Sequence, residues 1–136
     1  EYGCCGLSEE DAIRLHGEDN IETYLFEFGT LEHQAAHRVK HVDGVEDDMP
    51  ATNLSKLVCL KTQDEKVIGF HFVGPNAGEI TQGFALAVRL GAKKSDFNKL
   101  VGIHPSDAES FCAMGITRSS GVSFTAEGGC GGGVCG

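Results

Sequence analysis

Three segments of the chain carry the apolar patterns typical of β-strands, residues 21–28, 56–61 and 66–73. In the first segment hydrophobic and polar positions alternate, which puts Tyr24, Phe26 and Phe28 on one face. A polar turn at residues 63–65 separates the other two segments. The pattern therefore predicts one strand and, further along the chain, a β-hairpin.

Four other segments have the spacing or the end signals of helices. Ser8 and Gly17 are typical of the start and end of a short first helix. The strongest helix prediction covers residues 76–91, where apolar residues recur at helical spacing. We expect Ser95 to cap a third helix and Pro105 to begin a fourth. The third helix would bear Phe97, Leu100 and Val101, and the fourth would have Ala108, Phe111 and Cys112 on its inner side.

These elements follow one another as helix, strand, two strands and three helices, without the βαβ alternation of a parallel sheet. The order predicts one α+β domain, a small antiparallel sheet with helices packed against one face. The acidic segment 42–53 is expected to be a surface loop. Small residues dominate from position 119 onward, which predicts that order fades toward the C-terminus.

Composition excludes several classes of function. The net charge is −9, and basic residues form no dense cluster, so nucleic-acid binding is not expected. No apolar run approaches 18 residues, so no membrane span is predicted. The chain begins at Glu1 without an initiating Met or a signal peptide, and we expect it to be a piece of a longer protein.

The six cysteines are not distributed like those of a secreted disulfide framework. Cys59 and Cys112 each lie inside an apolar segment, where a free cysteine behaves as a small hydrophobe. For the adjacent Cys4 and Cys5, a tight turn with one sulfur buried is favoured over a strained vicinal disulfide. This cysteine usage indicates a reducing compartment, the cytoplasm.

The last nine residues are two cysteines, six glycines and one valine. Such a tail has almost no side chain to bury, so it cannot belong to a core. Because glycine accepts positive φ, the chain can turn back and bring Cys130 and Cys135 within disulfide distance. A structural staple is the alternative, but closing so short a loop stabilises by only about 2 kcal/mol. We interpret the two cysteines as a redox-active pair on a flexible tail.

Residues 102–109 are the second candidate site. Pro105 at the start of a helix would leave His104 at its cap, with the imidazole free to face a cleft. Glu109, about one turn later, could reach one imidazole nitrogen and leave the other to move protons. The alternative is a surface histidine beside an acidic first turn. The spacing alone favours this alternative.

Metal and nucleotide sites receive less support. Three histidines would share one face if their segment were helical, namely His33, His37 and His41, and could hold zinc or copper. No carboxylate or thiol is suitably spaced to join them, so a solvated face is favoured and no metal site is predicted. Gly78 and Gly83 bracket a helical turn without the G-x-G-x-x-G spacing or a preceding βαβ unit, so they are expected to be packing glycines and not a dinucleotide-binding loop.

Several stretches together carry a family resemblance: residues 1–10, residues 67–79 with Thr81-Gln82-Gly83, and residues 102–109. They resemble the C-terminal interface (dimerisation) domain of high-molecular-weight thioredoxin reductases, which belong to the pyridine nucleotide-disulfide oxidoreductases. The ending Gly-Cys-Gly-Gly-Gly-Val-Cys-Gly resembles the all-cysteine tail of the protozoan enzymes. The resemblance implies an interface domain at residues 1–124 and a redox tail at residues 125–136.

The resemblance also implies a function. In that family a homodimeric flavoenzyme passes electrons from NADPH to FAD and then to a cysteine pair near the flavin. They next cross to the C-terminal cysteine pair of the partner subunit, which reduces thioredoxin. Cys130 and Cys135 would be this C-terminal pair. His104 would be the acid–base group that faces the partner subunit's cysteine pair, and Glu109 the residue that orients His104.

FAD and NADPH would be bound by other domains of the full-length enzyme, and this chain is expected to bind neither. Three alternatives stay open. The chain could be a dimerisation module with a redox-inactive tail, or a metal-binding module. It could also be a domain similar to that of glutathione reductase, although this leaves the cysteine-bearing extension unexplained.

Overall fold

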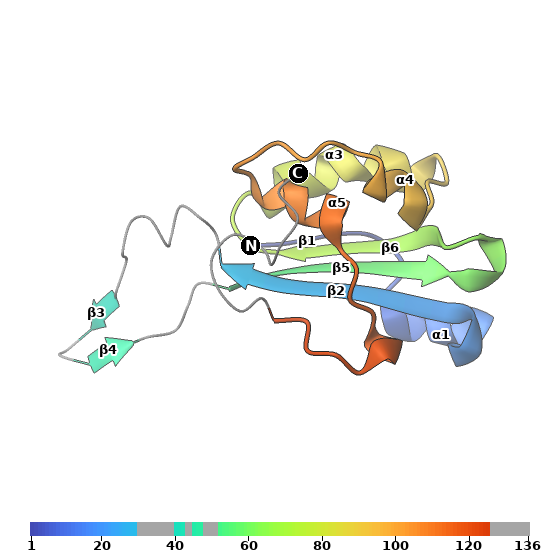
Figure 1. Cartoon of the computed structure of the whole chain (residues 1–136), viewed down its shortest axis with the longest axis horizontal. Coiled ribbons are helices and arrows are strands. Elements are labelled where there is room, and N and C mark those ends of the chain that lie inside the picture. The colour runs from blue at the N-terminus through green and yellow to red at the C-terminus, as the bar shows by residue number, and fades with distance from the viewer. Residues whose placement is uncertain (30–39, 43–44, 48–51, 126–136) are drawn as a thin grey trace.

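The computed structural model of the chain describes residues 1–29, 40–42, 45–47 and 52–125 (Figure 1). The strands are β1 (Tyr2–Gly6), β2 (Ile21–Gly29), β3 (Lys40–Val42), β4 (Val45–Asp47), β5 (Thr52–Leu60) and β6 (Lys66–Val73). The α-helices are α1 (Glu9–His16), α3 (Ala77–Arg89), α4 (Lys94–Asn98) and α5 (Ser110–Ala113). Short 3₁₀ turns are η1 (Glu18–Asn20), η2 (Lys61–Gln63), η3 (Asp107–Glu109) and η4 (Arg118–Ser120).

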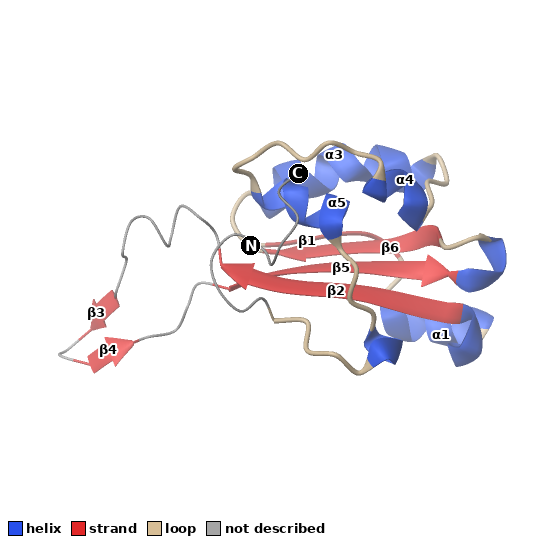
Figure 2. Cartoon of the chain, in the orientation of Figure 1, coloured by secondary structure: helices blue, strands red, loops and turns tan. Residues whose placement is uncertain are grey.

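The main sheet is antiparallel, with the strand order β1-β6-β5-β2. Helices α3, α4 and α5 cover one face, and α1 lies against the other (Figure 2). Strands β3 and β4 form a separate two-stranded sheet. The α+β prediction is confirmed, but the expectation that all helices pack against one face is wrong for α1.

The α1 side of the sheet has its own small core. Ala12 of α1 packs with Ile21 of β2 and with Val58 and Leu60 of β5. The helix itself begins and ends as the sequence predicts. Ser8 Oγ accepts a hydrogen bond from the Asp11 N–H at 3.1 Å. Gly17 then ends the helix with a φ of 85°, which favours glycine.

The larger core lies between the sheet and helices α3, α4 and α5, and phenylalanine rings dominate it. Its rings in mutual contact are Phe70, Phe72, Phe84, Phe97 and Phe111. The aromatic side chains of β2 that the alternation placed on one face are partly buried against this same cluster. Burying rings of this size is the main apolar contribution to the stability of the domain.

Two loop predictions are wrong in part. The segment 42–53 contains strand β4 and the first residues of β5. The stretch Tyr2–Gly6 is strand β1, which the sequence did not reveal because its small residues show no alternation. Cys4 and Cys5 therefore lie in a strand rather than in a turn, and both are free thiols. Adjacent strand residues face opposite ways, so Cys4 is exposed while Cys5 packs against the larger core.

The ends of the last helices also differ from the prediction. Helix α4 begins at Lys94 after Lys93, whose backbone N–H donates to Asp96 Oδ2 at 3.0 Å, so Ser95 is not its cap. Pro105 precedes a short 3₁₀ turn that starts only at Asp107. Leu100 and Val101 lie beyond the last residue of α4, and both are exposed.

Cys59 is fully buried in the larger core, as expected of a cysteine that acts as a small hydrophobe. Burial raises the pKa of its thiol to about 12. Burial likewise raises the pKa of Cys112. Within the described ranges, no helix is long and apolar enough to cross a membrane.

A buried carboxylate links three parts of the fold on the α1 side. Glu9 pairs with Lys56 Nζ of β5 at 2.7 Å, and with Nε and Nη2 of Arg118 at 2.7 and 2.9 Å. Burial acts to raise the pKa of Glu9, but the bonds to Lys56 and the charge of Arg118 outweigh it and lower the pKa from its ordinary value of 4.5. Ionised Glu9 therefore ties α1 to β5 and to the C-terminal segment.

We predict that acid destabilises the fold through Glu9. Because the folded-state pKa lies below that of the unfolded chain, the stabilisation is fully present above about pH 4.5. It is lost as the pH falls through the folded-state pKa. Glu9→Gln should lower the free energy of unfolding near neutral pH by about 2–3 kcal/mol, and should flatten the acid limb of a urea-denaturation series.

Glu10→Gln, at the neighbouring exposed position, is the matched control and should change neither quantity. If Glu9→Gln and the parent chain lose stability along the same acid limb, Glu9 is not the responsible group.

Candidate active site

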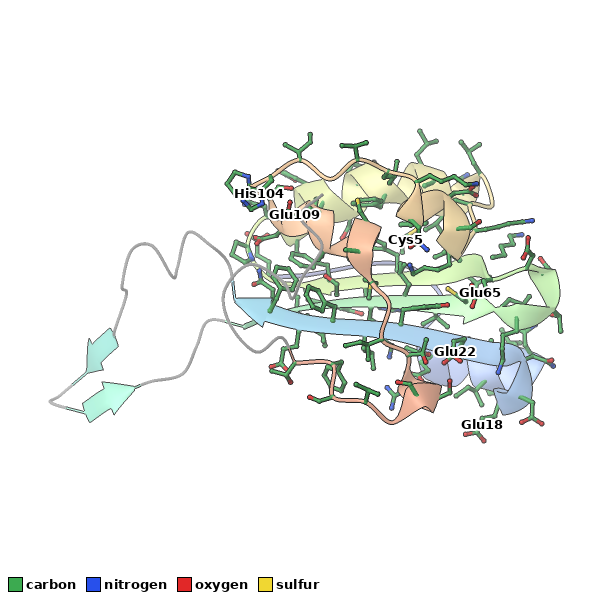
Figure 3. The ribbon with its side chains drawn as sticks, viewed as in Figure 1. Cys5, Glu18, Glu22, Glu65, His104 and Glu109 are labelled. Atoms are coloured by element: carbon green, nitrogen blue, oxygen red, sulfur yellow. The ribbon has the colours of Figure 1, made fainter. Side chains whose placement is uncertain are left out.

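His104 and Glu109 lie side by side at one end of the helical layer (Figure 3). His104 Nδ1 is 3.0 Å from Glu109 Oε1 and 3.2 Å from Oε2. The His104 side chain is 48% exposed and that of Glu109 34%. The structure thus brings together the two residues that the sequence proposed as a pair.

The contact fixes the form of the imidazole. A carboxylate only accepts hydrogen bonds, so His104 Nδ1 carries the hydrogen and donates it to Glu109. In the neutral ring this leaves Nε2 as an acceptor. Among the described residues, no group forms a hydrogen bond with Nε2. A half-exposed imidazole held in this way can take up and release a proton at Nε2.

The backbone at Glu109 is held by the two residues that follow it. Ser110 Oγ donates to the carbonyl of Asp107 at 2.7 Å, so its oxygen is left to accept from Ser55 Oγ of β5, also at 2.7 Å. Both serines are buried. Next in the chain, Phe111 is fully buried, with its ring centroid 4.2 Å from that of Phe70. These contacts fix the 3₁₀ turn that carries Glu109 against the sheet.

Gly102 lets the loop pass close to this turn. A Cβ atom at this position would lie 2.8 Å from Glu109 Cβ and 3.4 Å from Glu109 Cα. No flexible side-chain end could move aside to relieve such a clash. Gly102 therefore permits the approach of His104 and Glu109, although neither its spacing nor its neighbours in the sequence point to this role.

The other predicted site residues are placed only in part. Cys130 and Cys135 lie outside the described residues, as do His33 and His37. His41 lies in strand β3, so no helix that carries His33 and His37 extends to this residue. Within the described part of the chain, no group of three or more His, Cys, Asp or Glu residues could hold a metal ion.

Most of the chain matches one known protein family. The family described as "Pyridine nucleotide-disulphide oxidoreductase, dimerisation domain" matches residues 1–114. The chain belongs to this family of dimerisation domains. The match includes both residues of the pair and ends before the cysteine-bearing tail.

Individual relatives of the dimerisation domain extend the similarity to the tail. The chain is 58% identical, over its whole length, to thioredoxin reductases of Plasmodium falciparum isolates FCH-5 and 3D7, covering 26% and 23% of those proteins. It is 49% identical to thioredoxin reductase SEP1 of Emiliania huxleyi, over 94% of this chain and 24% of the relative. The chain thus spans about a quarter of the length of these relatives.

We predict that Gly102→Ala separates the pair while leaving the fold of the dimerisation domain intact. The new methyl group displaces Glu109, so His104 loses its fixed tautomer and becomes a mixture of both neutral forms. Imidazole ¹⁵N chemical shifts measured by NMR on the neutral ring would report this change. Gly115→Ala, where a Cβ meets nothing within 4 Å, is the control. A single Nδ1–H tautomer in Gly102→Ala would show that the close approach is not required.

Proposed function

We propose that this chain is the dimerisation domain and redox tail of an NADPH-dependent thioredoxin reductase of the cytoplasm. The observation that carries the proposal is the His104–Glu109 pair, which has the geometry of an acid–base group for thiol chemistry. The names of the relatives that match the whole chain support the same activity. The relay itself uses Cys130 and Cys135 of the tail.

FAD and NADPH supply the electrons when they are bound by the rest of the enzyme. Two cavities among the described residues have volumes of about 220 and 300 Å³ and lie beside α1. Charged side chains make up most of the lining of the larger of these two. We assign both cofactors to parts of the enzyme outside this chain.

The proton chemistry follows from the pair. Nε2 of His104 takes the proton of one thiol of the partner subunit's flavin-proximal cysteine pair. The resulting thiolate attacks one sulfur of the Cys130–Cys135 disulfide, so that a mixed disulfide forms and the S–S bond of the tail breaks. The leaving thiolate takes a proton from Nε2 of His104, while Glu109 stabilises the imidazolium through Nδ1–H. The second thiol of the attacking pair then closes its own disulfide. The tail is left as a dithiol, which reduces the disulfide of thioredoxin.

A second subunit is expected to lie next to His104. Four apolar side chains on the outer side of α3 and on the loop before His104 are more than 60% exposed, namely Leu86, Leu90, Val101 and Ile103. Exposed apolar side chains clustered on one surface mark interaction sites. We assign this surface to the homodimer interface, which would bring the partner's cysteine pair to His104.

A dimerisation module with a redox-inactive tail is the second candidate. The family match supports it, because that match covers residues 1–114 and not the tail. The two candidates differ in what the tail cysteines do. A reductase needs both sulfurs, whereas a module that only holds two subunits together needs neither.

We predict that Cys130→Ser or Cys135→Ser abolishes thioredoxin reduction by the full-length enzyme, since either change removes the disulfide. The rate at which NADPH reduces the flavin should stay at the parent value, because that step precedes the tail. Stopped-flow absorbance and a thioredoxin-coupled assay would separate the two rates. Cys4→Ser, at an exposed free thiol, is the control. Undiminished thioredoxin turnover in either tail variant would support the dimerisation module.

We also predict that this chain, produced alone, is colourless and does not oxidise NADPH. A yellow protein with a flavin absorption band would contradict the assignment of FAD to other domains.

A further inference from the structure

The outer edge of strand β2 is covered by the C-terminal segment 116–125 (Figure 1). The Leu25 N–H donates to the carbonyl of Ile116 at 3.1 Å, and the Glu27 N–H donates to that of Phe124 at 2.8 Å. The edge that would otherwise be free is therefore paired with the last described residues of the chain. The segment over which order is expected to fade is described as far as Thr125.

Three carboxylates of α1 and β2 each bind a different residue of this segment. The pairs are Arg118 with both oxygens of Glu9 at 2.7 and 2.9 Å, Ser119 Oγ with Glu22 Oε2 at 2.6 Å, and Thr125 Oγ1 with Glu27 Oε2 at 2.8 Å. Figure 3 shows Glu22 where β2 passes above the segment. Hydrogen bonds to a charged acceptor are stronger than neutral ones.

Polar contacts hold residues 118–125 on β2. All residues from Arg118 to Thr125 are exposed, so apolar burial contributes little to holding them on β2. Segments with few buried contacts open at low free energy. Removing the three side-chain donors should therefore release residues 117–125 without disturbing the cores. Glu9 keeps its partner Lys56 when Arg118 is removed.

We propose that Arg118, Ser119 and Thr125 are positioning residues that fix where the cysteine tail leaves the domain. This inference rests on the proposed function of Cys130 and Cys135. Cys130 is only five residues beyond Thr125, a reach of about 17 Å for extended chain. With Thr125 held, Cys130 can lie no more than about 17 Å from it.

Release of residues 117–125 from β2 would let Cys130 reach a larger volume. The chain between the last held residue and Cys130 would grow from five residues, counted from Thr125, to 14, counted from Ile116. The effective concentration of a tethered group falls as roughly the −3/2 power of tether length. Transfer of electrons to the tail should therefore slow about fivefold.

The test uses the full-length enzyme with the triple change Arg118→Met, Ser119→Ala and Thr125→Val. The matched control makes the same changes elsewhere, as Arg14→Met, Ser95→Ala and Thr62→Val at exposed positions. Hydrogen exchange at the amide of Glu27, which donates to the carbonyl of Phe124, should quicken in the triple variant and not in the control. Flavin reduction by NADPH should match in both, while reduction of the tail disulfide in a single turnover falls about fivefold.

A glycine-serine insertion after Thr125 separates positioning from general damage. In the parent enzyme, five added residues double the length of chain between Thr125 and Cys130, which should slow tail reduction about threefold. In the triple variant the same insertion lengthens a chain that is already longer, and should slow tail reduction only about 1.6-fold. General damage would give the same factor in both backgrounds. Equal factors, or a triple variant as fast as its control, would overturn the proposal.

Different results would contradict the proposed redox relay and the proposed positioning role. If Cys130→Ser retains thioredoxin turnover, the proposed function is wrong, whatever the triple variant does. If Cys130→Ser is inactive while the triple variant reduces its tail at the control rate, the relay stands and only the positioning role is wrong.

Discussion

The arrangement of the site depends on the packing of Phe111 into the larger core. Its ring contacts Phe70, Phe72 and Phe84, and so joins the last helix to both the sheet and α3. Glu109 lies two residues before this anchor and Ser110 one residue before it. A half-exposed carboxylate thereby gains a fixed backbone position without being buried itself. A group that must exchange protons with a partner needs this combination of fixed position and exposure.

The two faces of the sheet are held by different interactions and carry different parts of the domain. The face under α3, α4 and α5 is held by aromatic packing and carries the His104–Glu109 pair and the exposed apolar side chains. The α1 face is held by a small aliphatic core and by the charges around Glu9. Those charges also hold the segment that leads to the tail. Apolar burial thus fixes the backbone of Glu109, whose carboxylate contacts His104, while an ion pair and two hydrogen bonds to carboxylates hold residues 118–125 on the α1 side.

The sequence predicted the features that depend on local patterns. The alternation of β2, the capping by Ser8 and the spacing of α3 each reflect contacts within a few residues. Strand β1 was missed because its pairing with β6 comes from distant residues rather than from its own pattern. The same holds for Gly102 and Ser55, whose roles arise only when the loop and β5 meet the turn at Glu109. The sequence could suggest contact between His104 and Glu109, because these residues are only five positions apart.

The central claim is that Glu109 acts on catalysis only through His104. A double-mutant cycle in the full-length enzyme, read as kcat for thioredoxin reduction, tests it most directly. His104→Ala should reduce kcat by about 10²–10⁴-fold, the usual contribution of a positioned acid–base group, and Glu109→Ala by less. The double variant should be no slower than His104→Ala alone, because Glu109 has nothing left to orient. Multiplicative losses in the double variant would show that the two residues act independently and would contradict the account.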